Sequence, residues 1–126
     1  MSGKETVDIL LVDDQPAHLL TYEAILRPLG HRLVTATSGV EALARLMERE
    51  FAVILLDVSM PEMDGIQTIQ EIRKLPKGGD LPIIAVTAKA MKGDREKCLD
   101  AGASDYISKP VNTDQLLSLM RVWLYR

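Results

Sequence analysis

The sequence has one cysteine, few aromatic residues and no long apolar run. Because Cys98 is the single cysteine among 126 residues, the chain cannot form an internal disulfide or a cysteine metal cluster. Aromatic residues make up 4% of the chain, so aliphatic side chains and methionine must build the core. The apolar runs are far shorter than the roughly 20 residues that span a bilayer, and residues 1–5 show no signal-peptide core. We therefore expect no membrane insertion and a cytoplasmic location.

A basic excess is also missing. The 15 basic and 18 acidic residues give a formal net charge of −3, whereas domains that bind nucleic acid phosphates are usually basic. We therefore expect no direct binding to nucleic acid. The 47% hydrophobic and 26% charged residues are typical of a globular protein and exclude disorder. The length is that of one domain, and no segment has the composition of a linker.

Short apolar runs alternate with longer stretches of helical periodicity. The short runs predict strands at 8–12, 32–36, 51–56, 82–86 and 105–107. The stretches after them predict five helices, of which the second begins with a capping box at Ser38 and the fifth follows Asn112. The first, third and fourth runs are almost continuously apolar, which is typical of strands buried on both faces. The alternation predicts a doubly wound α/β domain with a parallel sheet.

Polar residues follow these strands at the end where doubly wound sheets bind ligands. In chain order they are Asp13 and Asp14, Asp57, Thr87 and Lys109. Three carboxylates at one edge of a sheet repel each other unless a cation compensates them. Oxygen ligands without cysteine or histidine favour Mg²⁺ or Mn²⁺ over zinc. Carboxylates, a hard cation, a lysine and a hydroxyl form a site that can hold a phosphoryl group, and a carboxylate can be the nucleophile that accepts it.

These residues lie in motifs that resemble the receiver domain of two-component response regulators. The motifs are Leu-Leu-Val-Asp-Asp at 10–14, Leu-Leu-Asp at 55–57, Met-Pro-Glu-Met-Asp-Gly at 60–65, Val-Thr-Ala at 86–88, Gly-Ala-Ser-Asp-Tyr at 102–106 and Ser-Lys-Pro at 108–110. Each motif is weak alone, but their order and spacing are specific and cover essentially the whole chain. The resemblance implies a flavodoxin-like sheet with strand order 2-1-3-4-5, and a single receiver domain over 1–126 with its core at 6–126.

The resemblance also implies the chemistry of the site. Asp57 would accept a phosphoryl group from a histidine kinase or a histidine phosphotransfer domain. Mg²⁺, with Mn²⁺ as an alternative, would be held by Asp13, Asp14, Asp57 and the backbone carbonyl of Ser59, with Asp14 holding it more directly than Asp13. Lys109 would contact the phosphoryl oxygens. The domain would catalyse its own phosphorylation and dephosphorylation, and would be a switch rather than an enzyme with a turnover substrate.

In the same family, phosphorylation changes a surface of the domain. Thr87 would move toward the phosphoryl group and Tyr106 would turn inward, altering the surface made by the fourth helix, fifth strand and fifth helix. That surface is also where we expect a homodimer to form. The peptide bond between Lys109 and Pro110 is typically cis. Four neighbours are expected to modulate the site: Ser59, Ala88, Lys89 and Pro110.

Other functions fit the sequence less well. Mg²⁺-dependent phosphatases and phosphotransferases usually have Asp-x-Asp at the nucleophile, whereas residues 57–59 read Asp-Val-Ser. A nucleotide-binding domain would have a Gly-rich loop after the first strand, and residues 13–18 contain no glycine. The alternative that stays open is a degenerate receiver, an interaction module that works without phosphorylation. The C-terminal part, residues 88–123, looks most like receivers of hybrid sensor histidine kinases, which favours a piece of a longer protein over a stand-alone regulator.

Residues away from the strand ends have simpler interpretations. Cys98 is expected in the core. His18 and His31 are expected at the surface rather than as metal ligands or bases. Gly65 is expected to permit close packing. For Trp123 two interpretations stay open, because it can cover the edge of the core or contact a partner.

Overall fold

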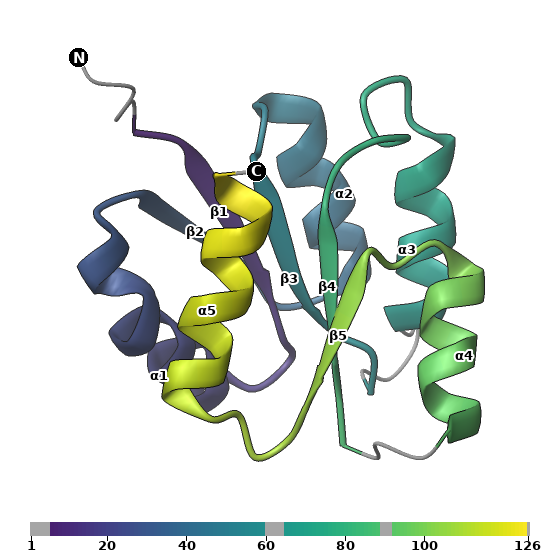
Figure 1. Ribbon diagram of the computed structural model, residues 1–126. Coiled ribbons are helices and arrows are strands. Elements are labelled where there is room, and N and C mark those ends of the chain that lie inside the picture. The colour runs from purple at the N-terminus through teal and green to yellow at the C-terminus, as the bar shows by residue number, and fades with distance from the viewer. Residues whose placement is uncertain (1–5, 60–64, 89–91, 126) are drawn as a thin grey trace.

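A parallel sheet lies between two layers of helices (Figure 1). The structure, a computed structural model, describes residues 6–59, 65–88 and 92–125. The strands in these residues are β1 (Asp8–Val12), β2 (Arg32–Ala36), β3 (Val53–Asp57), β4 (Ile83–Thr87) and β5 (Asp105–Ser108). The helices are α1 (Pro16–Leu26), the 3₁₀ turn η1 (Arg27–Leu29), α2 (Gly39–Glu48), α3 (Gly65–Lys74), α4 (Lys92–Ala101) and α5 (Thr113–Leu124).

The strand order is β2-β1-β3-β4-β5, and every neighbouring pair is parallel. The predicted architecture and strand order are therefore confirmed. Because β2 and β3 lie on opposite sides of β1, the winding reverses there, and the carboxyl ends of β1 and β3 flank the point where such folds bind ligands. The predicted third strand is shifted: β3 starts at Val53 rather than at position 51 and includes Asp57, which pairs with Val86 of β4.

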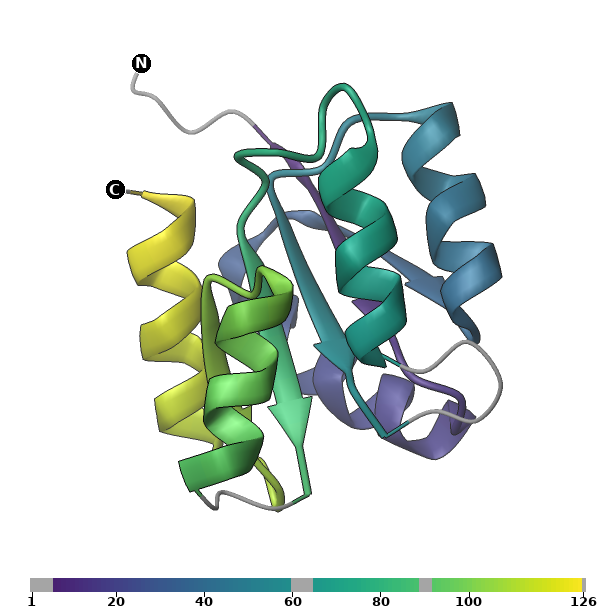
Figure 2. The ribbon, with the colours of Figure 1, turned by 90° about the vertical axis from the view of Figure 1, so that its right-hand side faces the viewer.

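Alternate residues of the strands face the two helical layers. Ile9 and Leu11 of β1 pack in a core cluster with residues of α1 and α5, whereas Leu10 and Val12 pack in a second cluster with residues of α2, α3 and α4. Figure 2 shows α2, α3 and α4 side by side over that second face. All residues of β3 and β4 are buried, as expected for central strands. Cys98 is 1% exposed in the second cluster, which confirms its predicted place in the core.

Local sequence signals begin several helices. The Ser38 hydroxyl accepts a hydrogen bond from the Glu41 amide at 3.0 Å, which confirms Ser38 as the predicted cap of α2. The Glu41 carboxylate accepts a bond from the Thr37 amide at 2.8 Å, one residue before the amide expected for a capping box. Asn112 caps α5 in the same way. At the start of α3, a Cβ on Gly65 would lie 2.1 Å from the Cα of Val58. Only glycine lets α3 begin so close to the end of β3, so the predicted close packing is confirmed.

Arg73 joins two loops at the amino edge of the sheet, which is the edge where the strands begin. From the last turn of α3, its guanidinium donates to the carbonyl oxygens of Gly78 and Leu81, each at 2.6 Å, before β4. It also donates to the carbonyl of Gly102 at 2.9 and 2.6 Å and to the Ser104 hydroxyl at 3.3 Å, before β5. Arg73 therefore connects the ends of α3 and α4 to the strands that follow them.

Trp123 lies half-buried against the α1 and α5 side of the core, and its Nε1 donates to the Asp105 carboxylate at 3.2 Å. This placement supports the interpretation that Trp123 covers the edge of the core. In the part of the chain that the structure describes, no helix combines the length and the apolar character needed to cross a membrane.

Candidate functional site

The strand register brings the predicted site residues to the carboxyl edge of the sheet, the lower edge in Figures 1 and 2. Val12 pairs with Leu56, so Asp13 and Asp57 emerge next to each other. Thr87, at the end of β4, pairs with Ser108, and Lys109 follows directly. Asp13 and Asp57 are 0% and 2% exposed, so the two carboxylates are buried despite their position at the end of the strands.

Asp57 is held by two donors. Its Oδ1 accepts a hydrogen bond from the Ser59 amide at 2.9 Å, and its Oδ2 lies 3.1 Å from the Lys109 Nζ. The Lys109 side chain is 22% exposed, and its backbone amide donates to the Thr87 carbonyl at 2.8 Å. The peptide bond between Lys109 and Pro110 is cis, as the family resemblance implies. Asp57 thus has one oxygen oriented by the backbone and the other beside an ammonium group.

Asp13 has three hydrogen-bond partners. Its Oδ1 accepts from the Gln15 amide at 2.9 Å, and its Oδ2 accepts from the Tyr22 hydroxyl at 3.2 Å and from His18 Nδ1 at 3.1 Å. Burial raises the pKa of Asp13, and the charge of Asp57 raises it further, although the bonds from Gln15 and His18 act in the opposite direction. Burial and the same two carboxylates also raise the pKa of Tyr22. The edge of the sheet therefore holds more negative charge than its hydrogen bonds offset.

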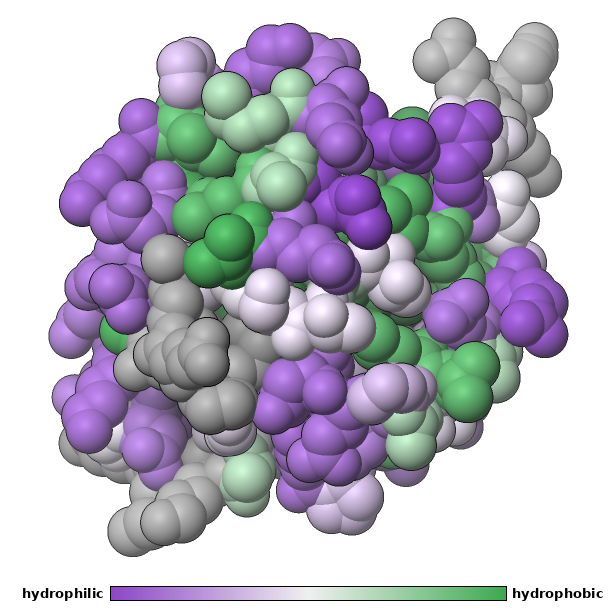
Figure 3. Space-filling model, turned by 180° about the vertical axis from the view of Figure 1, so that it is seen from behind, coloured by the Kyte–Doolittle hydropathy of each residue, from purple (hydrophilic) through white to green (hydrophobic). Residues whose placement is uncertain are grey.

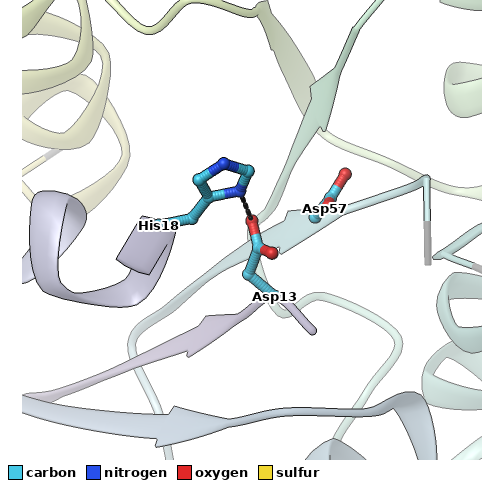
Figure 4. A group of neighbouring side chains, drawn as sticks. All are labelled: Asp13, His18 and Asp57. Carbon is cyan, nitrogen blue, oxygen red and sulfur yellow. Dashed lines mark hydrogen bonds and ion pairs between the residues drawn. The ribbon is translucent and has the colours of Figure 1, made fainter. Parts of the chain in front are cut away.

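Asp13, His18 and Asp57 could together hold a metal ion, since each offers one ligand atom and these atoms lie within 4.8 Å of one another (Figure 4). Asp14 is half-buried and follows Asp13, but it does not belong to this group. Ser59 is close to the group through its bond to Asp57.

The expectation that His18 lies away from the strand-end residues is wrong, because His18 contacts Asp13. Its side chain is 36% exposed and its ring bonds to the buried carboxylate of Asp13. Pro16 starts α1 directly after the strand-end loop, so a residue in the first helical turn is carried back toward the end of β1. Pro16 is the one signal in the sequence that could have indicated this contact, because it sets where the helix begins. His31 is elsewhere, bonded to the Val7 amide and the Tyr125 hydroxyl.

The two predicted switch residues lie on adjacent strands. Tyr106 pairs with Ala85, two residues before Thr87, so Thr87 and Tyr106 face the same side of the sheet. Thr87 is buried and Tyr106 half-buried. The Tyr106 hydroxyl accepts a hydrogen bond from Arg95 Nη1 at 2.8 Å, and the guanidinium carbon lies 5.5 Å from the ring centre. Tyr106 is therefore bound to a side chain of α4.

Two cavities lie at opposite edges of the sheet. The one at the carboxyl edge has a volume of about 200 Å³ and is lined by Val58, Ser59, Ile66, Thr87, Ala88, Asp94, Lys97 and Cys98. The other, of about 450 Å³, lies between the last turns of α2 and α3 and contains no predicted site residue. Apolar side chains gather in the upper part of the face seen in Figure 3.

Some predicted residues are not described by the structure. Lys89, which was expected to modulate the site, and the motif residues 60–64 lie outside the described residues.

Comparisons with known proteins agree with this geometry. Residues 9–121 match the response regulator receiver domain. The chain is 40% identical over 118 residues to the signal transduction histidine-protein kinase BarA of Escherichia coli (strain K12), which covers 94% of this chain and 13% of BarA. The chain therefore spans only a small part of that relative.

Solved structures show the same likeness. The receiver domain of sensor histidine kinase PA1611 from Pseudomonas aeruginosa PAO1, with a magnesium ion coordinated in its active site cleft, is 38% identical with a TM-score of 0.88 over 97% of this chain and 100% of that one. Chemotaxis protein CheY4 of Vibrio cholerae is 28% identical with a TM-score of 0.90 over 95% of this chain and 100% of that one. The chain belongs to the response regulator receiver domain family and is a receiver domain of two-component signalling.

Proposed function

We propose that Asp57 is the phosphoacceptor of this domain and takes its phosphoryl group from a phosphohistidine on a histidine kinase or a histidine phosphotransfer domain. The observation that carries the proposal is the Asp57 carboxylate, which is 2% exposed, 3.1 Å from Lys109 and next to Asp13. A buried carboxylate reduces stability unless its charge is compensated. Here the compensating groups are also those that phosphoryl transfer needs.

The transfer is a displacement at phosphorus. An Asp57 oxygen attacks, a P–O bond forms, the P–N bond of the phosphohistidine breaks, and its electron pair leaves with the imidazole nitrogen. The Ser59 amide keeps Oδ1 oriented, and the Lys109 ammonium, already beside Oδ2, stabilises the charge on the phosphoryl oxygens. Hydrolysis of the acyl phosphate later restores Asp57. The domain thus catalyses its own phosphorylation and dephosphorylation.

We also propose that Asp13, Asp14, Asp57 and the backbone carbonyl of Ser59 hold Mg²⁺, with Mn²⁺ as an alternative. The raised pKa of Asp13 supports this, because it reflects buried negative charge beside Asp57. Oxygen donors of this kind suit both ions. The magnesium ion in the similar PA1611 receiver domain also supports the assignment. Such a cation supplies positive charge near the phosphoryl oxygens.

The signal would leave the site through Thr87 and Tyr106. If Thr87 moves toward the phosphoryl group and Tyr106 turns inward, the 2.8 Å bond between Tyr106 and Arg95 must break. This frees a side chain of α4 and changes the surface formed by α4, β5 and α5, through which we also propose a homodimer.

Three further expectations accompany this proposal. We propose that four residues modulate the site: Ser59, Ala88, Lys89 and Pro110. We also propose that residues 1–126 form one receiver domain and that this domain works in the cytoplasm.

The test is the intact mass of the chain after incubation with acetyl phosphate and Mg²⁺. Wild type is expected to gain one phosphoryl group only when Mg²⁺ is present. Asp57→Asn is expected to gain none, and Asp100→Asn, which alters an exposed aspartate of α4, is the matched control and is expected to react as wild type does. Labelling that persists in Asp57→Asn would contradict the assignment. A wild type that neither gains mass nor responds to beryllofluoride would favour the module that works without phosphorylation.

A further inference from the structure

We propose that His18 is a further metal ligand of this site, through Nδ1, and that it shifts the preference of the site from Mg²⁺ toward divalent transition metals. The inference rests on the proposed function, because it adds a ligand to the same cation. Three elements would supply the ligands: the end of β1 with Asp13, the first turn of α1 with His18, and the end of β3 with Asp57 (Figure 4).

The distances fit one octahedral cation. Ligand bonds of about 2.1 Å place neighbouring ligand atoms about 3.0 Å apart and opposite ones about 4.2 Å apart. His18 Nδ1 and Asp13 Oδ2 are 3.1 Å apart, which matches neighbouring positions. All three ligand atoms lie within 4.8 Å of one another, so small side-chain rotations are enough to bring the Asp57 oxygen to the same ion.

The position of His18 is fixed by its backbone. Pro16 is the first residue of α1, and the His18 amide donates to the Gln15 carbonyl at 3.0 Å. Because α1 also packs Leu19 and Tyr22 into the core, the imidazole is held over the end of β1. The ring is thus placed by a helix that packs on the sheet rather than by a loop.

The imidazole must release its Nδ1 proton before Nδ1 can bind a cation. A carboxylate oxygen only accepts hydrogen bonds, so Nδ1 carries the proton that His18 donates to Asp13. Binding of a cation at Nδ1 requires this proton to leave the nitrogen, and the partly exposed side chain lets water accept it. The cation then takes the place of the hydrogen bond between His18 and Asp13.

An imidazole ligand has a predictable effect on selectivity. Mg²⁺ prefers oxygen ligands, whereas imidazole suits first-row transition metals, whose affinities rise from Mn²⁺ to Ni²⁺. His18 should therefore add little to Mg²⁺ binding and much more to binding of Co²⁺ or Ni²⁺. If His18 only oriented Asp13 through the hydrogen bond, its loss would weaken all of these ions to a similar degree.

The test uses the full chain loaded with Mn²⁺ and measures nitrogen hyperfine coupling by pulsed electron paramagnetic resonance. Asparagine can keep a hydrogen bond to Asp13 but has no imidazole, so His18→Asn separates ligation from orientation. We expect imidazole coupling in wild type, its loss in His18→Asn, and its retention in His31→Asn, the matched variant of the other histidine. Calorimetric titration should show a Kd for Ni²⁺ about tenfold higher in His18→Asn, with a change below about twofold for Mg²⁺.

The outcomes separate this inference from the proposed function. Bound Mn²⁺ without imidazole coupling, in a chain that is still phosphorylated on Asp57, overturns the role of His18 and leaves the proposed function intact. A Ni²⁺ affinity that is unchanged in His18→Asn, or that falls no more than the Mg²⁺ affinity, also overturns it. A wild type that binds neither Mg²⁺ nor Mn²⁺ contradicts both the inference and the proposed metal site.

Discussion

The two edges of the sheet hold charged side chains in different ways. At the amino edge, the guanidinium of Arg73 is surrounded by the carbonyl oxygens of Gly78, Leu81 and Gly102. At the carboxyl edge, Asp13 and Asp57 lie next to each other, and the Lys109 ammonium contacts one oxygen of Asp57. Carbonyl oxygens and the opposite charge of Asp80 compensate Arg73, whereas Asp13 and Asp57 keep an excess of negative charge.

Burial disfavours the charged form at both edges. It lowers the pKa of Arg73 and raises the pKa of Asp13. At Arg73 the charge of Asp80 acts against this shift, and the guanidinium donates to carbonyl oxygens of two loops. Asp13 has a like charge beside it instead. We infer that the amino edge contributes stability, and that the excess charge at the carboxyl edge suits the cation and phosphoryl binding proposed above.

The largest expected effect comes from breaking the amino edge. Arg73→Met removes the donor for carbonyls in two loops, and we expect the free energy of unfolding to fall by about 3 kcal/mol, measured by urea denaturation. Lys74→Met is the matched control, because the Lys74 side chain is 71% exposed and its ion pair with Glu71 lies at the surface. The control should change stability by less than about 0.5 kcal/mol. If the two substitutions lowered the free energy of unfolding equally, the structural role assigned to Arg73 would be wrong.

A substitution at the carboxyl edge is expected to change the free energy of unfolding less, and to raise it rather than lower it. Asp13→Asn removes one of two adjacent buried carboxylates, so without divalent cations we expect a gain of about 1 kcal/mol in the free energy of unfolding. The pKa of Asp13 in the folded state is raised above 3.8, so its folded state binds more protons than the unfolded state just above that pH. Its contribution to stability is therefore greatest at low pH and falls as the pH rises through the folded pKa.

Urea denaturation of both proteins in EDTA, from pH 4 to pH 7, checks this expectation. The advantage of Asp13→Asn should grow with pH and then stay constant. Added Mg²⁺ should stabilise wild type more than the variant, because binding to the folded state alone raises its stability. A variant that is less stable than wild type at neutral pH in EDTA would show that the hydrogen bonds of Asp13 outweigh its buried charge.

The smallest effect is expected where a charge is exposed. Tyr106→Phe removes the hydrogen bond from Arg95, whose guanidinium is at the surface, and should cost less than about 0.5 kcal/mol in urea denaturation. The phenyl ring of this variant would keep the place of the Tyr106 ring, which packs against the core. Amide exchange of α4 in the unphosphorylated protein should nevertheless become faster. Unchanged exchange in Tyr106→Phe would show that Tyr106 does not hold α4.

Much of the fold followed from local patterns. Apolar runs predicted the strands, and the Ser38 and Asn112 caps marked two helix starts, because these signals depend on residues close in sequence. The end of β3 was predicted less well, since Asp57 extends the strand through its pairing with Val86 of β4. A strand boundary depends on the neighbouring strand as well as on its own residues.

The site shows the same division. The order of the motifs along the chain was enough to predict that Asp13, Asp57, Thr87 and Lys109 lie at the carboxyl ends of parallel strands and share one edge of the sheet. Three contacts emerge only from the folded chain: His18 faces Asp13, Tyr106 bonds to Arg95, and Arg73 reaches a carbonyl 29 residues away. Periodicity and capping are local, but these contacts depend on how a helix packs on the sheet and where its side chains then point.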